Sequence, residues 1–300
     1  MVKDRFFISC FLLSLMIPTA YADLPLTIED LLTAERRWRI ELNTTYSNND
    51  KTNLDSRYGI IQIGQNQFIS IPTSVSDARQ NSDILAISIG ARYGLTLNSE
   101  LYSRISGIAE YTRSMNTDGR SNVRDIRASD LWFGLNHRFS DDNETPALLG
   151  FAEVALAENV AWQDEEFVYG KSLLIGMTTY RAIDPIVLSL TTGYNYSQTR
   201  DVGKNEDNPG DFIFVNPSMS FAINNQVTTT VGGRWQARDR DEYNGKQWGI
   251  RTTKTSMDFG LGYSWSKKLT LQVNSRFDIS GEANSSTSLN MIYKLSQKHL

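Results

Sequence analysis

The stretch SKKLTLQVNSRFDIS, from Ser266 to Ser280, alternates in polarity. One series of alternate positions is apolar except at Ser275: Leu269, Leu271, Val273, Phe277 and Ile279. The positions between them are polar: Thr270, Gln272, Asn274, Arg276 and Asp278. Because successive side chains of a strand point to opposite faces, this pattern predicts a β-strand with one apolar face and one polar face. The apolar face must meet either a protein core or membrane lipid.

Twelve segments of the chain show the same alternation, beginning with WRIELNTTYS at Trp38 and ending with SLNMIYKL at Leu295. Long and short connections alternate between them. The long ones are expected near residues 48–83, 114–127, 158–170, 200–211 and 238–253, and the short ones include SDDNETP, IDP, NNQ and SKK. Outer-membrane barrels place short turns in the periplasm and long loops outside. The spacing therefore favours an up-and-down meander with one plain side and one elaborated side.

These observations predict an all-β fold, a transmembrane β-barrel of twelve antiparallel strands over residues 38–295, with a tail at 296–300. Open sheet edges are unstable in hydrocarbon, so we expect the last strand to pair with the first. Aromatic residues near the strand ends, such as Trp38, Tyr111 and Trp265, fit the girdles of such barrels. The alternative is a secreted soluble β-protein with the apolar face in a core.

The N-terminus, MVKDRFFISCFLLSLMIPTAYA, has the three parts of a secretory signal peptide. Lys3 and Arg5 form the basic region, and Ala20-Tyr21-Ala22 supplies the cleavage site, so we expect residues 1–22 to be removed. Cys10, the one cysteine of the sequence, leaves with them, so the exported chain can form no disulfide. Export combined with the barrel pattern predicts localisation in a bacterial outer membrane.

Residues 23–37 form the expected periplasmic leader. Within them, LTIEDLLTAERR predicts a short helical segment, with Thr27 as its N-cap. Thr27, Ile28, Leu31 and Leu32 are the expected contact residues of a plug docked in the periplasmic mouth. A flexible connector between signal and barrel is the alternative.

Charged side chains occur on the polar faces of the predicted strands, where a water-filled lumen would contain them. The predicted lumen charges are Arg39, Glu41, Arg92, Arg104, Glu110, Arg138, Arg234, Asp258, Arg276 and Asp278. In a pore such charges set ion preference. Alternatively they form arginine–acid pairs that link neighbouring strands, and the two roles are compatible. The expected pairs are Glu41 with Arg39 or Arg276, and Asp258 with Arg276.

Composition excludes several other functions. The formal net charge of −4 is unsuited to nucleic acid. No cysteine–histidine cluster or calcium-loop spacing is present, so we expect no metal and no cofactor. An outer-membrane phospholipase is a less favoured alternative, suggested by His137, which shares a face with Leu135 and Phe139. No serine–histidine–acid spacing accompanies His137 or His299, and the chain is predicted not to be an enzyme.

Two stretches, LPLTIEDLLTAERRWRIELNTTYSN and RQNSDILAISIGARYGLTLNSELYSRIS, resemble a family of proteobacterial outer-membrane barrels. Members are labelled as transporters of phenol-degradation pathways or as outer-membrane proteins of filament operons. They are similar to the barrel of functional-amyloid exporters. The resemblance implies a twelve-stranded barrel that acts as a transport channel, with filament or secretion components and a homo-oligomer as partners. The amyloid exporters also carry a long N-terminal coiled coil, for which residues 23–37 are too short.

The predicted function is an outer-membrane channel for passive transport or export of small solutes or unfolded peptide, gated by the N-terminal segment. Outer-membrane lipids would be its surroundings. The alternative is a non-conducting surface or assembly barrel whose loops bind a partner. The first loop contains the alternating stretch GIIQIGQNQFISIPT, and both an inward constriction and an external hairpin are consistent with it, as is a partly ordered loop without a special role.

Overall fold

The computed structural model describes residues 32–51, 57–73, 79–116, 119–161, 166–280 and 284–295. The expected signal peptide, most of the leader and the tail at 296–300 lie outside these residues. No helix in this part of the chain has the length and apolarity that a membrane crossing requires.

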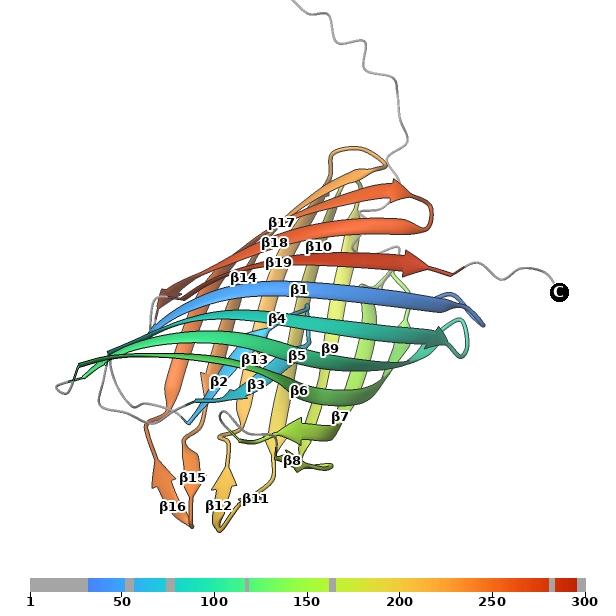
Figure 1. The fold of residues 1–300 in the computed structure, drawn as a ribbon. Helices are drawn as coiled ribbons and strands as arrows, with labels where there is room; N and C mark the ends of the chain where they lie inside the picture. The colour runs from blue at the N-terminus through green and yellow to red at the C-terminus, as the bar shows by residue number, and fades with distance from the viewer. Residues whose placement is uncertain are drawn as a thin grey trace, which may run out of the picture.

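Twelve antiparallel strands close into a barrel, as the alternation predicted (Figure 1). In chain order they are β1 (Trp38–Lys51), β4 (Arg79–Gly94), β5 (Ser99–Asn116), β6 (Gly119–Ser140), β7 (Ala147–Asn159), β9 (Ser172–Ile183), β10 (Ile186–Ser197), β13 (Phe212–Ala222), β14 (Val227–Arg238), β17 (Thr252–Ser266), β18 (Leu269–Ser280) and β19 (Asn284–Lys294). Each pairs with its neighbours along the chain, and β1 pairs with β19. A two-residue strand, β8 (Phe167–Val168), extends the sheet beside β7.

The apolar series of each strand faces outward. Ile105, Leu261 and Phe277 remain 55%, 52% and 49% exposed, although such side chains normally occupy a core. The alternate positions face the interior, where many charged and hydroxyl side chains are buried. The expected apolar belt around a polar interior is therefore present, and a soluble sandwich would have the opposite arrangement.

Several strands extend beyond the apolar pattern. We expected a loop near residues 114–127, but β5 and β6 continue almost to the tip of their hairpin. The loops near residues 200–211 and 238–253 likewise contain β11 (Arg200–Val202), β12 (Asn205–Asn208), β15 (Asp241–Tyr243) and β16 (Lys246–Trp248), which form a separate sheet. Beyond the membrane, backbone pairing needs no hydrophobic alternation, so the pattern cannot reveal these strands.

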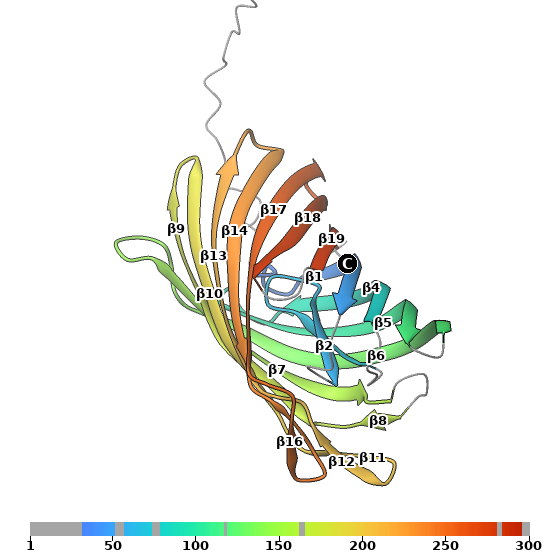
Figure 2. The same ribbon diagram turned by 90° about the vertical axis from the view of Figure 1, so that its left-hand side faces the viewer.

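The first loop folds inward. Its two strands, β2 (Tyr58–Gln62) and β3 (Phe68–Pro72), form a hairpin that lies inside the curve of the barrel wall (Figure 2). Ile69 and Ile71 of this hairpin are 0% and 1% exposed. Of the two arrangements consistent with the sequence, the structure has the inward constriction.

The expected helix before the barrel is not confirmed. Leu32–Arg37, the part of that segment that the structure describes, contains a bend, a bridge and a turn instead of a helix. Thr27, Ile28 and Leu31 lie outside the described residues. Glu35 forms a parallel bridge with Gly94, so backbone pairing replaces the expected helical hydrogen bonds here.

Candidate channel lumen

One side of the hairpin packs on an aliphatic part of the inner wall. Ile61, Ile63, Ile69 and Ile71 form a buried cluster with wall residues of β4 and β5, namely Ile84, Ala86 and Ile108. These wall residues point into the barrel, where water would surround them if the hairpin were absent. Burial of this apolar surface favours the docked position of the hairpin.

Phe68 anchors the other side of the hairpin in an aromatic cluster. Its ring lies 4.9 Å from that of Phe214 and 5.3 Å from that of Phe212. The guanidinium of Arg234 lies over the Phe68 ring at 4.6 Å. Trp132, Phe151, Ala155 and Leu174 complete this cluster from β6, β7 and β9. The inward faces of these strands are apolar because they receive the hairpin.

Side chains of the wall also bind the backbone of the hairpin. Four carbonyl oxygens of the hairpin segment accept hydrogen bonds from β1, β5, β6 and β14: Asn43 donates to Ile63 at 2.6 Å, Arg104 to Phe68 at 2.8 Å, Arg127 to Pro72 at 3.3 Å and Arg238 to Tyr58 at 2.7 Å. At the hairpin turn, Asn216 of β13 donates to the carbonyl oxygen of Gln65 at 3.3 Å. The hairpin is thus fixed to strands on several sides of the barrel.

The open end of the hairpin is connected to the sheet β11–β12–β15–β16. The Tyr58 hydroxyl donates to Asp207 at 2.9 Å, and Arg57 forms an ion pair with the same carboxylate at 3.2 Å. The backbone N–H of Arg57 donates to Asp241 at 2.8 Å. Burial and the negative charge of Asp207 raise the pKa of Tyr58 well above its ordinary value. These contacts form a latch between the constriction and the long loops.

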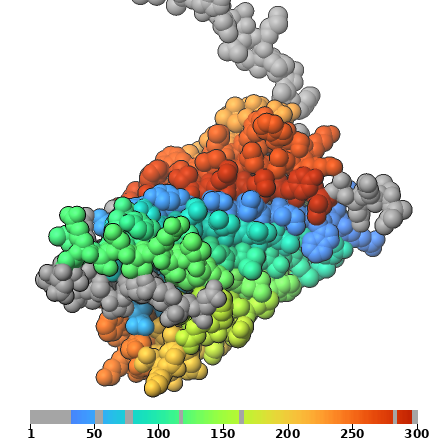
Figure 3. Space-filling view, in the orientation of Figure 1, coloured from blue at the N-terminus to red at the C-terminus, as the bar shows by residue number. Residues whose placement is uncertain are grey.

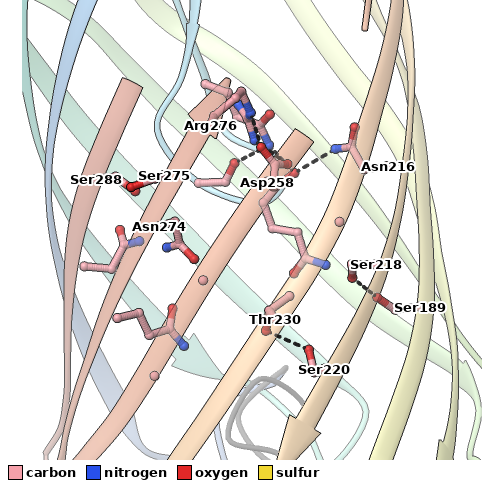
Figure 4. Close-up of a pocket in the computed structure, with 18 of the residues that line it drawn as sticks. Ser189, Asn216, Ser218, Ser220, Thr230, Asp258, Asn274, Ser275, Arg276 and Ser288 are labelled. Atoms are coloured by element: carbon pink, nitrogen blue, oxygen red, sulfur yellow. Dashed lines mark hydrogen bonds and ion pairs between the residues drawn. The ribbon is translucent and has the colours of Figure 1, made fainter. Parts of the chain in front are cut away.

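A polar cavity of about 200 Å³ separates the hairpin turn from the wall formed by β10, β13, β14, β17, β18 and β19. Its lining consists mainly of serine, threonine, asparagine, glutamine and glycine. Figure 4 shows two hydroxyl pairs in this wall, Ser189 with Ser218 at 2.6 Å and Ser220 with Thr230 at 2.9 Å. No aromatic side chain other than Tyr180 is among the lining residues. The cavity can therefore accommodate a small hydrophilic molecule.

Two further cavities adjoin the first. One of about 190 Å³ lies towards β1, β4, β5 and β6, and its lining shares Gly64, Gln65, Thr178, Gln272 and Asn290 with the first cavity. The other, of about 50 Å³, lies towards the long loops and shares Gln62, Arg276 and Ser286. Because they share lining residues, the three cavities follow one another along the hairpin.

The predicted charges near the short-turn end form one network. Arg39 and Arg92 contact Glu41 at 3.1 Å and 2.9 Å, and Arg92 also contacts Glu100 at 2.8 Å. Glu100 is completely buried. Two arginines and two carboxylates thus neutralise one another beside the second cavity.

The remaining predicted charges are distributed along the wall. Asp258 and Arg276 form a bidentate pair in the cavity wall at 2.5 Å and 2.9 Å (Figure 4). The other partners are Asp130 for Arg104, Arg127 for Glu110, Gln62 and Gln236 for Arg234, and Lys254 for Asp278. Arg138 instead lies at the rim, where it contacts Asp141 and the turn residue Asn98. Most of these charges are therefore held in pairs.

Sequence reasoning missed several buried charges of the interior: Glu100, Arg127, Asp130, Glu153, Glu158 and Arg200. Glu153 accepts a hydrogen bond from Tyr102 at 2.7 Å and lies 3.9 Å from Arg104. The available signal was that Glu153 shares a strand face with Phe151 and Ala155, because a carboxylate on one face of a strand that is apolar on both marks the inward side. Arg200 lay in a segment that we expected to be a loop.

The leader docks at the short-turn end through its last residues. The N–H of Thr33 donates to Glu100 at 2.7 Å, and the N–H of Arg36 donates to the carbonyl oxygen of Gly94 at 2.7 Å. A Cβ atom at Gly94 would lie 2.2 Å from the carbonyl oxygen of Ala34, so this close approach requires glycine. Of the predicted plug contacts, Leu32 alone is described, and it is half-buried.

His137, the basis of the phospholipase alternative, contacts a serine. Its Nδ1 lies 2.8 Å from Ser99 Oγ across the β5–β6 ladder, and its ring packs on Phe139. Within the described residues no carboxylate contacts the imidazole.

A closed barrel with an apolar outer belt, a charged interior and short turns at one end defines a β-barrel of the bacterial outer membrane. No family model matches the sequence, and no curated protein matches it.

Solved structures share the fold at low sequence identity. An outer-membrane channel from Pseudomonas putida F1 superposes with a TM-score of 0.62 at 12% identity, over 93% of this chain and 99% of the channel. The translocator domain of the autotransporter NalP from Neisseria meningitidis gives a TM-score of 0.51 at 8% identity, over 86% of this chain and 88% of that domain. The chain is therefore similar in fold to both of these solved barrels.

Proposed function

We propose that this protein is a passive outer-membrane channel for small hydrophilic solutes, with the β2–β3 hairpin as a movable constriction. The row of polar cavities along the hairpin is the observation that carries this proposal. Part of the apolar inner surface is covered by isoleucine and phenylalanine side chains of the hairpin itself, and most residues that line the remaining space are polar or glycine. The fold that the chain shares with an outer-membrane channel supports the proposal.

The charges of the wall favour solutes without net charge. The Asp258 and Arg276 side chains neutralise each other within the first cavity, and Glu41 is similarly paired with Arg92 beside the second cavity. Paired charges offer hydrogen bonds to a passing solute while they create only a weak net field. Neutral and zwitterionic molecules are therefore the solutes that this lumen fits best.

An unfolded peptide fits the lumen less well, because it needs more room than the cavities beside the hairpin provide. It would pass only after the hairpin had lost its contacts with β1, β5, β6, β13 and β14 together. A non-conducting barrel is the second candidate, and the filled interior favours it. A measurement of conductance distinguishes the channel from the non-conducting barrel.

A cross-link that fixes the hairpin turn tests the proposal. Gln65→Cys with Asn216→Cys places two thiols where the side chain of Asn216 meets the turn. Because Cys10 belongs to the expected signal peptide, these cysteines would be the only ones in the exported chain. The matched control is Ser99→Cys with His137→Cys, which links two wall strands through side chains that lie 2.8 Å apart and line none of the three cavities.

Liposome swelling with neutral solutes should fall when a short cleavable reagent joins the first pair, and should recover after cleavage. The control pair should show no such change. If planar bilayers show no conductance with the native chain or with a variant lacking both hairpin and leader, the channel proposal is wrong and the non-conducting barrel is favoured.

A further inference from the structure

The β5–β6 hairpin rises above the belt on the long-loop side. Its strands contain 18 and 22 residues, whereas a tilted strand crosses the hydrocarbon with about 9–11 residues. In Figure 1 this hairpin forms the far left of the barrel. Because long loops of outer-membrane barrels face the exterior, the extra length lies at the outer leaflet.

The outward face of this hairpin changes from apolar side chains to arginines at one level along its strands. Ala109 pairs with Ile126 in the last apolar row, and Tyr111 pairs with Arg124 in the next. Arg113 lies in the following row towards the hairpin tip. In the row after that, Met115 pairs with Arg120. Three arginines thus begin where the apolar belt ends, on the face that continues it. In Figure 3 this green hairpin lies uncovered at the viewer's side.

Two of these arginines lack a carboxylate partner among the described residues. Arg113 contacts Asp83 and donates to Asn81 at 2.6 Å, and its guanidinium lies 5.5 Å from the Tyr111 ring. Arg120 and Arg124 are exposed, and no ion pair is found for either within the part of the chain that the structure describes. The outward face therefore has an excess of positive charge beside the membrane surface.

Exposed apolar side chains lie on the same face as these arginines. Met115 and Ile126 are 61% and 67% exposed, and Tyr111 is 40% exposed. A ligand that meets this face would need anionic groups at the level of the arginines and hydrocarbon below them. Guanidinium groups bind phosphate through paired hydrogen bonds, which suits Arg120 and Arg124 to a phosphorylated headgroup.

We propose that the outer face of the β5–β6 hairpin binds a phosphorylated glycolipid of the outer leaflet, of the lipid A class. Arg113, Arg120 and Arg124 contact its phosphates, and Ile126 and Tyr111 contact the upper part of its acyl chains. Asn81 and Asp83 hold the Arg113 side chain against the wall. The site is on the outside of the barrel and is independent of transport through the lumen.

The test compares two triple variants of the full mature chain in detergent. The patch variant is Arg113→Gln with Arg120→Gln and Arg124→Gln. The control variant is Arg240→Gln with Lys246→Gln and Arg251→Gln, which removes the same charge from exposed residues on the same side of the membrane. Migration of heated and unheated samples on gels confirms that both barrels are folded.

Native mass spectrometry would measure binding of diphosphoryl lipid A, monophosphoryl lipid A and phosphatidylethanolamine. We expect several-fold weaker binding of diphosphoryl lipid A by the patch variant, unchanged binding by the control, and a smaller effect with the monophosphoryl form. Equal binding by the patch variant, or equal loss in the control, would overturn the proposal. Displacement of the lipid by an equal concentration of inorganic pyrophosphate would also overturn it, because the ligand would then be free phosphate.

Discussion

The hydroxyl of Tyr58, inside the barrel, donates a hydrogen bond of 2.9 Å to Asp207 of β12, which belongs to an extracellular loop. β12 pairs with β15, where Asp207 lies opposite Tyr243, so two loops meet at this point. Arg57 adds an ion pair to Asp207 and lies 4.2 Å from the Tyr243 ring. The constriction and the external sheet are therefore mechanically connected.

Asp207→Asn should loosen the hairpin. The substitution removes the carboxylate that Arg57 and Tyr58 share in a buried environment, and an unpaired buried charge is unfavourable. We expect a several-fold increase in swelling rate with small neutral solutes. Asp201→Asn, at an exposed position of β11, is the matched control and should leave the rate unchanged. Equal rates in the two variants would contradict a latch at Asp207.

Alkaline pH should release the same latch. The folded-state pKa of Tyr58 is raised above its ordinary value of 10.0, so docking is fully favoured below that pH and weakens above it. Between the ordinary and the raised pKa, the loss is about 1.4 kcal/mol per pH unit. Conductance should rise above pH 10 in the native chain. Tyr58→Phe should show a flatter profile, and a rise of equal size in both proteins would assign the effect to another group.

Ser288→Phe should narrow the first cavity. Ser288 of β19 lines that cavity, whereas Thr287 beside it is exposed on the opposite face. A phenyl group at position 288 would fill part of the cavity and should slow swelling most for the largest solutes tested. Thr287→Phe adds the same group to the outer belt and should change little. If both variants behave alike, solutes do not pass along this wall.

Phe68→Ala should weaken docking of the hairpin itself. Loss of a buried phenylalanine typically removes about 3–5 kcal/mol of stability. We expect a decrease approaching this size in the free energy of local opening, read from hydrogen exchange at Ile69 and Ile71. Phe277→Ala, in the outer belt, should leave exchange at these amides unchanged. Unaltered exchange in Phe68→Ala would show that the aromatic cluster contributes little to docking.

Gly94→Ala should displace the leader. A Cβ atom at position 94 would lie 2.2 Å and 2.5 Å from the carbonyl oxygens of Ala34 and Thr33. Gly90→Ala, on the same strand, places its Cβ no closer than 3.6 Å to any atom and serves as control. Protease cleavage near Thr33 should accelerate in the first variant alone. If conductance rises with cleavage, the leader gates the periplasmic mouth; if it does not, the leader is only a connector.

Alternation of polarity predicted the twelve strands and their two faces, because lipid and lumen impose opposite demands on successive residues. Alternation did not predict the strands that neither lipid nor lumen surrounds. The strands of residues 200–208 and 241–248 lie among the extracellular loops, and their pairing depends on contacts between two distant loops.

Within the lumen, sequence supplied candidate charges and two of their pairs, Asp258 with Arg276 and Glu41 with Arg39, which the structure contains. It did not supply the contact of Glu41 with Arg92. The contact of Asp258 with Arg276 follows from simple pairing of adjacent strands. That of Arg104 with the carbonyl oxygen of Phe68 does not, because it depends on a loop that enters the barrel. Arg138 occupies a position at which the alternation predicts a lumen-facing side chain, yet it lies at the rim. The end of a strand can extend past the lumen while its side chains continue to alternate.

The wall binds the hairpin largely through carbonyl oxygens, at Tyr58, Ile63, Phe68 and Pro72, and every amino acid carries that group. Substitutions in the hairpin can therefore alter the surface presented to a solute while the fixing hydrogen bonds persist. Positions of the hairpin that face the cavities, such as Gln65, can therefore change without removal of an acceptor that the wall binds.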